Sequence, residues 1–408
     1  MTLDTTFPVP LARLLVPIRL VPRAWLANLV QRHLRRGELN VTWPDGRCSL
    51  LQGAAEGPSA QLTLHSWRAL GRLVTGGSSA FADSYIDGDW DSEDPARLIE
   101  LGARNREAMD GPFRGNRMAR AWRRFLHFRQ ANTRPGSRRN IAAHYDIGNA
   151  FYRTWLDDSM TYSSGVYAAD DANLSQAQAE KYARILGMLD AKPGQHIVEI
   201  GCGWGGFALF AAERGLRVTG ITLSREQHDE ATRRALAAGV ADRVEIRRMD
   251  YRDLDGKFDH AVSIEMIEAV GEAYWPAYFA KVASLLTDGG RFAVQAITID
   301  EPLFEPYRDD PDFIQTHIFP GGMLPSLPRL RAAAGTAGLV ASGVQAYGLH
   351  YARTLREWRE RFVTAWPTIE AHGFDAPFFR LWNLYLAYCE GGFRAGTIDL
   401  HQVLLVRR

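Results

Sequence analysis

The glycine-rich stretch VEIGCGWGGFALFA, residues 198–211, has the composition of a loop that holds a nucleoside cofactor. Four glycines fall within six residues, directly after an apolar run that carries an acid. Glycine lets the backbone turn sharply and approach a ligand at the start of a helix. Gly201, Gly203 and Gly206 form a G-x-G-x-x-G pattern, which fits a dinucleotide, another nucleoside cofactor or only a tight turn.

The neighbouring acids favour a methyl donor over a dinucleotide. Glu199 precedes the first glycine by two residues, and this spacing resembles the E/D-x-G-x-G-x-G motif of class I S-adenosylmethionine-dependent methyltransferases. The stretch RRMDYRDL then offers Asp250 and Tyr251 to an adenine. A dinucleotide fold needs an acid about 20 residues after the glycines, and GITLSREQ has none directly after its strand. Ser224 and Arg225 keep an NADP site open as the alternative.

These residues need a parallel sheet to bring them together. Alternating apolar strands and amphipathic helices predict an α/β, Rossmann-like sheet with helices on both faces. The strands are expected at residues 196–200, 217–222, 244–249, 260–264 and 291–296. We expect a smaller N-terminal α+β helper domain at 1–110, a basic amphipathic connector at 111–143 and a catalytic domain at 144–408.

Composition limits the classes of partner. The 408 residues are 46% hydrophobic and 23% charged with a formal net charge of +1, which is ordinary for a globular protein without a global attraction to nucleic acid. Cys48, Cys202 and Cys389 show no metal-ligand spacing, so no metal site is expected. The prolines near the N-terminus fit neither a signal peptide nor a spanning helix. A cytoplasmic location is the expectation.

Five further motifs bear on the methyl acceptor. They are HYDIGNAFYRTWLDDSMTYSSGVY, IEMIEAVG, HIFPGGMLPS, HYARTLREW and CEGGFRAGTIDLHQVLL. In this order, together with SYIDGDW upstream, they resemble the cyclopropane-fatty-acyl-phospholipid synthases and the related mycolic acid methyltransferases. An RNA methyltransferase is the more distant alternative, but the chain has neither an Asn-Pro-Pro-Tyr-like stretch nor paired catalytic cysteines.

The resemblance implies methyl transfer from S-adenosylmethionine to a cis double bond of an unsaturated phospholipid acyl chain. In the family a bound bicarbonate then removes a proton from the new methyl group, and a cyclopropane closes. The motifs place the following residues on the catalytic side: Glu268, Ile297, Ser164, Tyr351 and Cys389. They place the following on the cofactor side, in addition to the glycine turn: Tyr162, Ser163, Thr222 and Gln227.

Two positions depart from the family pattern. Gln295 stands where the best-known members have a bicarbonate-binding histidine, and His317 stands where they have a tyrosine. Bicarbonate is therefore in doubt as a second cofactor, and His317 could hold the anion or act as the base itself. The alternatives are a methyl-branched, methylene-branched or furan-precursor acyl chain, or a lipid-binding relative without catalysis.

Some of these residues also have an ordinary structural explanation. Glu265 and Glu268 are three residues apart at a predicted helix start, where they could cap the helix or favour its dipole. Cys389 could be a packing residue. The motif around Glu268 favours catalysis for that residue.

A basic segment could meet an anionic membrane surface. Residues 111–140 hold nine arginines and no acid. The predicted interfacial helix contains Arg114, Arg117, Arg120, Trp122, Arg123, Arg124 and Phe125. A second basic amphipathic stretch at 26–36 could assist, and a linker helix with Trp122 packed inward is the alternative. We expect a peripheral membrane protein, a possible homodimer and no nucleic-acid partner.

Overall fold

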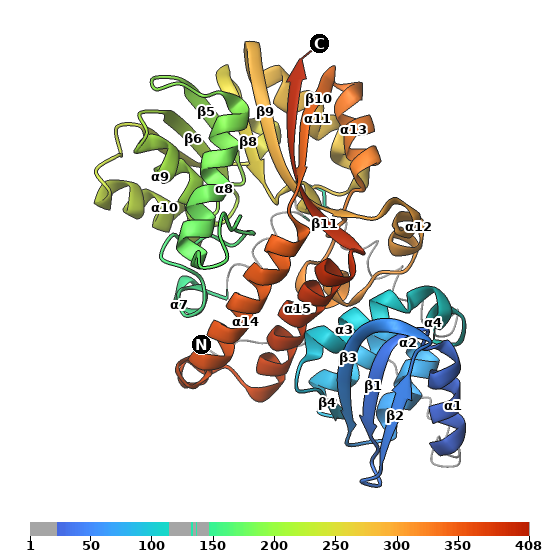
Figure 1. Cartoon of the computed structure of the whole chain (residues 1–408). Helices are drawn as coiled ribbons and strands as arrows, with labels where there is room; N and C mark the ends of the chain where they lie inside the picture. Colours follow the sequence, from blue (N-terminus) through green and yellow to red (C-terminus); the bar gives the residue numbers. More distant parts are fainter. Residues whose placement is uncertain (1–22, 114–131, 134–135, 137–146, 408) are drawn as a thin grey trace. The chain divides into compact units, whose positions relative to one another are not determined.

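The computed structural model describes residues 23–113, 132–133, 136 and 147–407 (Figure 1). The chain divides into two compact units, Met1–Trp122 and Arg123–Arg408. Each unit has its own sheet. The predicted interfacial helix and nearly all of the connector lie outside the described residues.

The first unit has helices α1 to α4 around a four-stranded sheet of order β2-β1-β3-β4. Its elements are α1 (Arg23–His33), β1 (Arg36–Thr42), β2 (Cys48–Gln52), β3 (Ala55–Leu64), α2 (Arg68–Ile86), β4 (Trp90–Asp91), α3 (Pro95–Arg104) and α4 (Arg106–Phe113). Along β1 every second residue is buried, among them Leu39 and Val41, because neighbouring side chains of a strand point to opposite faces. This unit is the α+β fold expected for the N-terminal part.

The second unit is built on a seven-stranded sheet of order β10-β11-β9-β8-β5-β6-β7. The strands are β5 (His196–Ile200), β6 (Arg217–Thr222), β7 (Val244–Arg248), β8 (Phe258–Ile264), β9 (Leu286–Ile299), β10 (Leu339–Ala346) and β11 (Ile398–Arg407). Strands β7, β6, β5, β8 and β9 are parallel neighbours, whereas β11 runs antiparallel to β9 and β10. The expected α/β sheet is confirmed.

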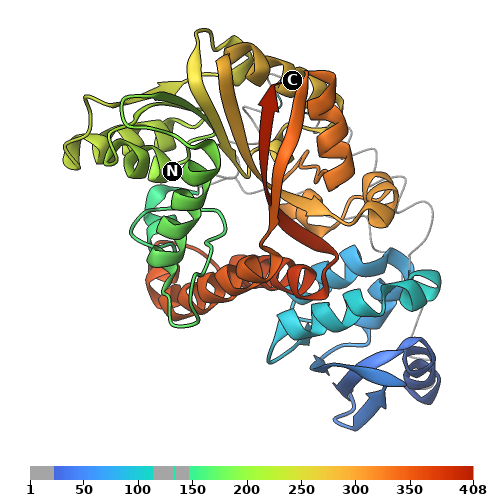
Figure 2. The same cartoon turned by 45° about the horizontal axis from the view of Figure 1, so that its top comes forward.

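Helices cover both faces of this sheet (Figures 1 and 2). The main ones are α8 (Leu174–Leu189), α9 (Gly206–Ala212), α10 (Arg225–Ala237), α11 (Trp275–Leu285) and α13 (Leu327–Thr336). Ile197 of β5 belongs to the core under α8 and α9, and the next residue, Val198, belongs to the core under α11. Burial on both faces explains why four consecutive residues of β5, Ile197 to Ile200, are all buried.

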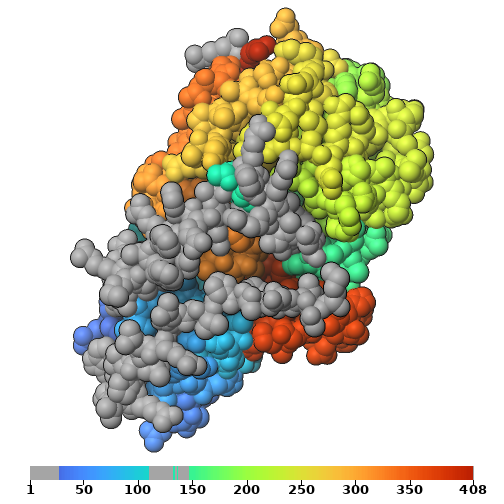
Figure 3. All heavy atoms as spheres, turned by 180° about the vertical axis from the view of Figure 1, so that it is seen from behind, coloured from blue at the N-terminus to red at the C-terminus, as the bar shows by residue number. Residues whose placement is uncertain are grey.

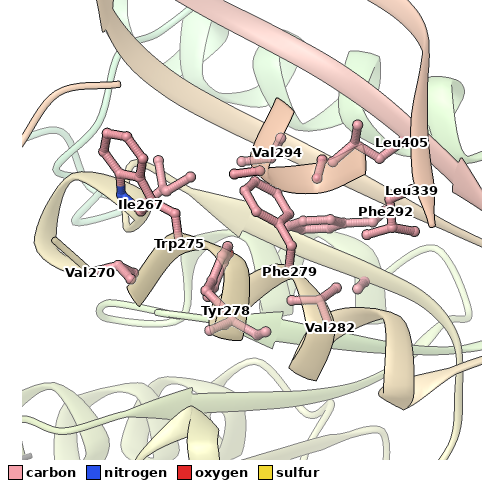
Figure 4. Close-up of a cluster of buried hydrophobic side chains, with 14 of the residues drawn as sticks. Ile267, Val270, Trp275, Tyr278, Phe279, Val282, Phe292, Val294, Leu339 and Leu405 are labelled. Carbon is pink, nitrogen blue, oxygen red and sulfur yellow. The ribbon is translucent and has the colours of Figure 1, made fainter. Parts of the chain in front are cut away.

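Aromatic and branched side chains fill the core under α11 (Figure 4). Phe279 and Val282 of α11 pack toward Phe292 and Val294 of β9, and Leu405 of β11 closes the cluster. From behind, the segments around α10 and α11 form the yellow-green to yellow surface of this unit (Figure 3). The packing holds the carboxyl ends of the strands in fixed positions.

Shorter elements and a helical pair complete the unit. The shorter elements are α7 (Asn149–Arg153), η2 (Tyr251–Asp253), η3 (Ile267–Ala269), η4 (Glu272–Tyr274), α12 (Glu301–Asp309) and η5 (Ile314–Ile318). The two long helices, α14 (Gly348–Ala371) and α15 (Ala376–Ala395), pack side by side (Figures 1 and 2). No described helix has the length and apolar character needed to cross a membrane.

Candidate active site

The glycine turn lies at the carboxyl end of β5 and leads into α9. Gly201, Gly203 and Gly205 have positive φ angles of 84°, 51° and 83°, a region in which side chains are disfavoured. A Cβ on Gly201 would lie 2.8 Å from Met266 Cγ, whereas a Cβ on Gly203 would meet nothing within 4 Å. The turn is therefore fixed by glycine and leaves space beside Gly203 for a ligand.

Glu199 supplies a buried acid below this turn. Its side chain is only 3% exposed, and its Oε2 has no hydrogen-bond partner among the described residues. Burial raises the pKa of Glu199 to about 8, and the nearby Lys181 opposes this rise. A buried polar atom without a partner costs free energy, so a donor such as a cofactor amino group would be stabilised there. These features fit the predicted cofactor.

The remaining predicted cofactor residues lie on neighbouring strand ends. Thr222 Oγ1 donates to Gln227 Oε1 at 2.7 Å, and both residues are buried. Asp250 accepts from Arg252 through both carboxylate oxygens, at 2.8 Å and 2.6 Å. The ring of Tyr251 lies edge-on to Tyr278. The sheet brings these residues to the same edge as the glycine turn because parallel strands share their carboxyl ends.

The segment from Tyr162 to Ser164 joins the helical pair to the sheet. Tyr162 and Tyr385 of α15 share a hydrogen bond of 2.6 Å between their hydroxyl groups. Ser163 Oγ accepts from Lys181 Nζ at 2.7 Å, and the backbone N–H of Ser164 donates to Glu265 Oε1 at 3.0 Å. The Ser164 hydroxyl group donates to the Gly165 carbonyl oxygen.

Lys181 is a residue near the site that no sequence motif indicated. It is fully buried in α8, and its Nζ also donates to Gln178 Oε1 at 2.6 Å. Burial lowers its pKa to about 7, while the nearby carboxylates of Glu265, Asp157 and Glu199 oppose this lowering. The helical pattern contained the signal, because Lys181 lies one turn from apolar Ala177 and Ile185 on the buried face.

Glu265 is a second such residue, and three residues predicted on the catalytic side, Ser164, Gln295 and Tyr351, donate hydrogen bonds to its carboxyl group. Gln295 Nε2 donates to its Oε1 at 2.8 Å, and the Tyr351 hydroxyl group donates to its Oε2 at 2.5 Å. With the Ser164 N–H, three donors therefore converge on one carboxyl group. The interpretation of Glu265 as a helix cap was wrong, because it follows β8 directly, with φ at 51°, and points into the interior.

Glu268 lies beside this carboxyl group in a different environment. Its Oε1 accepts from the backbone N–H of Ile297 at 2.5 Å, and its buried Oε2 has no partner among the described residues. Burial and the charge of Glu265 raise the pKa of Glu268 to about 8. Of two neighbouring buried carboxyl groups, the one with more donors keeps the negative charge and the other keeps the proton. With three donors, Glu265 is the carboxyl group of this pair that is better able to hold a negative charge.

The sequence matches the family described as mycolic acid cyclopropane synthetase over residues 132–403. The chain belongs to this family. It is 37% identical over 407 residues to the tuberculostearic acid methyltransferase UfaA1 of Mycobacterium tuberculosis, covering 96% of this chain and 93% of that protein. It is 34% identical over 343 residues to the cyclopropane-fatty-acyl-phospholipid synthase of Escherichia coli K12, covering 82% and 85%.

A solved structure agrees with this membership. The mycolic acid cyclopropane synthase CmaA1, complexed with SAH and CTAB, superposes with a TM-score of 0.62 at 30% identity. The superposition covers 66% of this chain and 97% of that one. The resemblance inferred from the motifs is confirmed, and the chain is a methyltransferase of this family.

In this member of the mycolic acid cyclopropane synthetase family, aromatic side chains surround Tyr162. Trp155 and Trp358 lie with ring centroids 5.4 Å from Tyr162, and Trp155 lies 6.1 Å from Trp382. Tyr351 stacks on Phe393 at 4.5 Å. Electron-rich ring faces stabilise cations, and this cluster continues to the Glu265 carboxyl group through Tyr351.

His317 and Cys389 are the two remaining residues that were predicted on the catalytic side. His317 lies in η5, a π-helical turn, and its ring centroid is 5.2 Å from that of Phe313. Burial raises the pKa of the Cys389 thiol, with a further contribution from Asp312, so a neutral thiol is favoured. This supports a packing role for Cys389.

No group of three or more His, Cys, Asp or Glu side chains in the described part of the chain is arranged to hold a metal ion.

Proposed function

We propose that this methyltransferase modifies lipids, moving a methyl group from S-adenosylmethionine to the cis double bond of an unsaturated phospholipid acyl chain and closing a cyclopropane ring. The observation that carries the proposal is the neighbouring pair of carboxyl groups, Glu265 and Glu268, which adjoins the aromatic cluster through Tyr351 and the glycine turn through Met266. Relatives named as fatty-acyl and mycolic acid cyclopropane synthases support the substrate class.

Residues of this chain would hold the methyl donor and stabilise the positive charge that forms on the acyl chain. S-adenosylmethionine provides an electrophilic methyl group on its sulfonium, and the glycine turn, Glu199 and Gln227 would hold it. An alkene is a poor nucleophile, so the acyl chain must be positioned over that methyl group. Methyl transfer leaves a carbocation on the acyl chain. The Glu265 carboxylate and the ring faces around Tyr162 would stabilise this positive charge in a site that excludes water.

A second product remains a candidate because of Gln295. Gln295 is neutral and buried, and its amide bridges Glu265 and Gln402. A relative that covers almost the whole chain is named a tuberculostearic acid methyltransferase. If a hydride shift moved the positive charge onto the methyl-bearing carbon before the methyl group lost its proton, the same methyl transfer would end in a methylene-branched acyl chain, and a subsequent reduction would give a methyl-branched one.

The cytoplasmic face of an anionic membrane is the proposed place of action. An acyl chain esterified in a bilayer must reach a protein with no described spanning helix. The basic segment at 111–140 supplies positive charge for lipid head groups. Homodimerisation stays a prediction.

The test is incubation of the full chain with unsaturated phosphatidylglycerol vesicles and methyl-labelled S-adenosylmethionine. We expect labelled acyl chains that are heavier by one methylene unit in mass spectrometry. Ring and methylene isomers share this mass, so chromatography against standards must separate them. A labelled cyclopropane supports the first product and a labelled methylene chain the second, whereas no labelled lipid overturns the proposed function.

A further inference from the structure

Three hydrogen-bond donors from separate segments hold the carboxyl group of Glu265. Gln295, at the position matched to a bicarbonate-binding histidine, donates its amide N–H to Glu265 Oε1, and the backbone N–H of Ser164 donates to the same oxygen. Tyr351, matched to an active-site tyrosine, donates to Oε2. We infer that Glu265 is the catalytic base of this enzyme, and that its carboxylate removes the proton for which other members use bicarbonate. This inference rests on the proposed function.

The backbone of Glu265 indicates that its placement has a function. Its φ of 51° lies in the left-handed region, where glycine is favoured and other residues are strained. Within the described part of the chain, only Met160 and Asp190 are other non-glycine residues with positive φ. Strain of this kind persists where surrounding contacts impose it, and it is concentrated at active sites. Here three hydrogen bonds from three separate segments impose it.

The surrounding charges favour an ionised Glu265. Lys181 of α8 faces the carboxyl group, and Tyr351 of α14 donates a hydrogen bond to it. Glu268 of η3 faces it too, but the raised pKa of Glu268 keeps that group protonated at neutral pH. Burial raises the pKa of Glu265 as well, which makes its carboxylate a stronger base once formed.

An ionised Glu265 also disfavours a second anion beside it. Two like charges in a buried site repel strongly, because no water screens them. Gln295 brings no positive charge to offset this repulsion, and its amide oxygen already accepts from Gln402 Nε2 at 2.9 Å. Bicarbonate is therefore unnecessary here and would be poorly bound.

The proposed step balances in atoms and charge. When the alkene takes the methyl group, a carbon–carbon bond forms, the carbon–sulfur bond breaks and the adjacent acyl carbon becomes a cation. Glu265 then accepts a proton from the new methyl group, and the C–H electron pair forms the third ring bond. A hydride shift before proton loss would give the methylene product through the same base. The neutral Glu265 finally returns its proton to water.

The first test compares turnover of the full wild-type chain in carbonate-free buffer with turnover in buffer that contains bicarbonate. We expect equal rates of label transfer to lipid in both. A rate that rises several-fold with bicarbonate overturns the inference while leaving the proposed function intact. If the wild-type chain labels no lipid in either buffer, the proposed function itself fails.

The second test removes the Glu265 carboxyl group by mutation and then supplies a small carboxylate or bicarbonate in the buffer. Glu265→Gln should lower label transfer by about 100-fold or more, the usual contribution of a general base. Glu265→Gly suits the positive φ and removes the carboxyl group, so added acetate or bicarbonate should restore turnover. Glu213→Gln, which removes an exposed carboxylate, should change neither the rate nor its response to acetate. Full activity in Glu265→Gln, or a Glu265→Gly enzyme that binds S-adenosylmethionine but is not rescued, overturns the inference.

Discussion

The backbone N–H of Ile297 donates to Glu268 Oε1 at 2.5 Å, while Oε2 of the same carboxyl group is buried without a described partner. This contact ties the end of β9 to η3, and the backbone N–H of Glu268 itself is the other donor to this carboxyl group. Two backbone donors do not offset the burial of a negative charge next to the Glu265 carboxyl group. Glu268 therefore takes up a proton on folding.

Stability should consequently fall as pH rises through the neutral range. The pKa of Glu268 rises from 4.5 to about 8 on folding, so the folded chain binds more protons than the unfolded chain between these values. The stabilisation is complete below about pH 4.5 and is lost as pH rises through about 8. Glu268→Gln lacks this titration, so its unfolding midpoint should fall less between pH 5.5 and pH 8.5 than that of the wild type.

Denaturant unfolding at several pH values measures this difference. Other groups titrate in the same range, but they do so in both proteins and cancel in the comparison. Glu213→Gln serves as the control, since that side chain is exposed and should leave the wild-type slope unchanged. Parallel pH profiles for wild type and Glu268→Gln would mean that Glu268 is ionised in the folded state.

Removal of the Tyr351 hydroxyl group should move the pH dependence of catalysis. Tyr351 donates to Glu265 Oε2, and a hydrogen bond to a charged group contributes roughly 1.5–3 kcal/mol. Tyr351→Phe should raise the pKa of Glu265, so the acidic limb of the pH–rate profile should shift upward by about one pH unit. The variant should lose most activity near neutral pH and recover at higher pH.

A second tyrosine offers a matched control for this measurement. The Tyr347 hydroxyl group bonds Gln345 and Arg184 and makes no described contact with Glu265. Tyr347→Phe should keep the wild-type pH profile. If Tyr351→Phe changes the rate equally at every pH, its hydroxyl group does not act through Glu265.

The sequence predicted the sheet well because local patterns determine it. The expected strands at 196–200 and 217–222 match β5 and β6, and β7 ends one residue early at Arg248. β9 is longer than expected, at Leu286–Ile299. The antiparallel β10 and β11 were not predicted, since their pairing joins segments far apart in the chain and leaves no local pattern.

The site was predicted less completely for a related reason. Motifs identified Ser164, Gln295 and Tyr351, but no spacing indicated that all three donate to one carboxyl group. Glu265 resembles a helix-cap residue in the sequence, and its role depends on a positive φ that only the folded chain shows. Lys181 was detectable as a charge on the buried face of a helix. The segments around residues 114–131 and 137–146 lie outside the described residues.

A methyl group added to Gly203 should interfere with the cofactor. Gly203 has positive φ, and the direction of its missing Cβ is open. If S-adenosylmethionine fills that space, Gly203→Ala should weaken its binding by about tenfold or more, in addition to a stability loss of about 1 kcal/mol from the left-handed backbone conformation. Calorimetric titration with S-adenosylmethionine measures the affinity.

The variant Gly239→Ala is the control that distinguishes a loss of stability caused by the backbone from a loss of S-adenosylmethionine affinity. It also has positive φ and an open Cβ direction, but it lies in the turn after α10. Gly239→Ala should lose similar stability and keep the wild-type affinity for S-adenosylmethionine. Equal affinities in the two variants would place the cofactor away from Gly203.

The basic segment should control binding to anionic membranes if the peripheral location is correct. Each arginine near such a surface contributes about 1 kcal/mol, so replacing Arg120, Arg123 and Arg124 by alanine should weaken vesicle binding by roughly 100-fold. Sedimentation with phosphatidylglycerol vesicles measures this, and affinity for S-adenosylmethionine should stay unchanged. Replacing the exposed Arg217, Arg225 and Arg243 instead removes the same charge from the sheet domain and should have little effect. If both triple variants lose vesicle binding equally, general charge attracts the chain to the membrane and the segment is a linker.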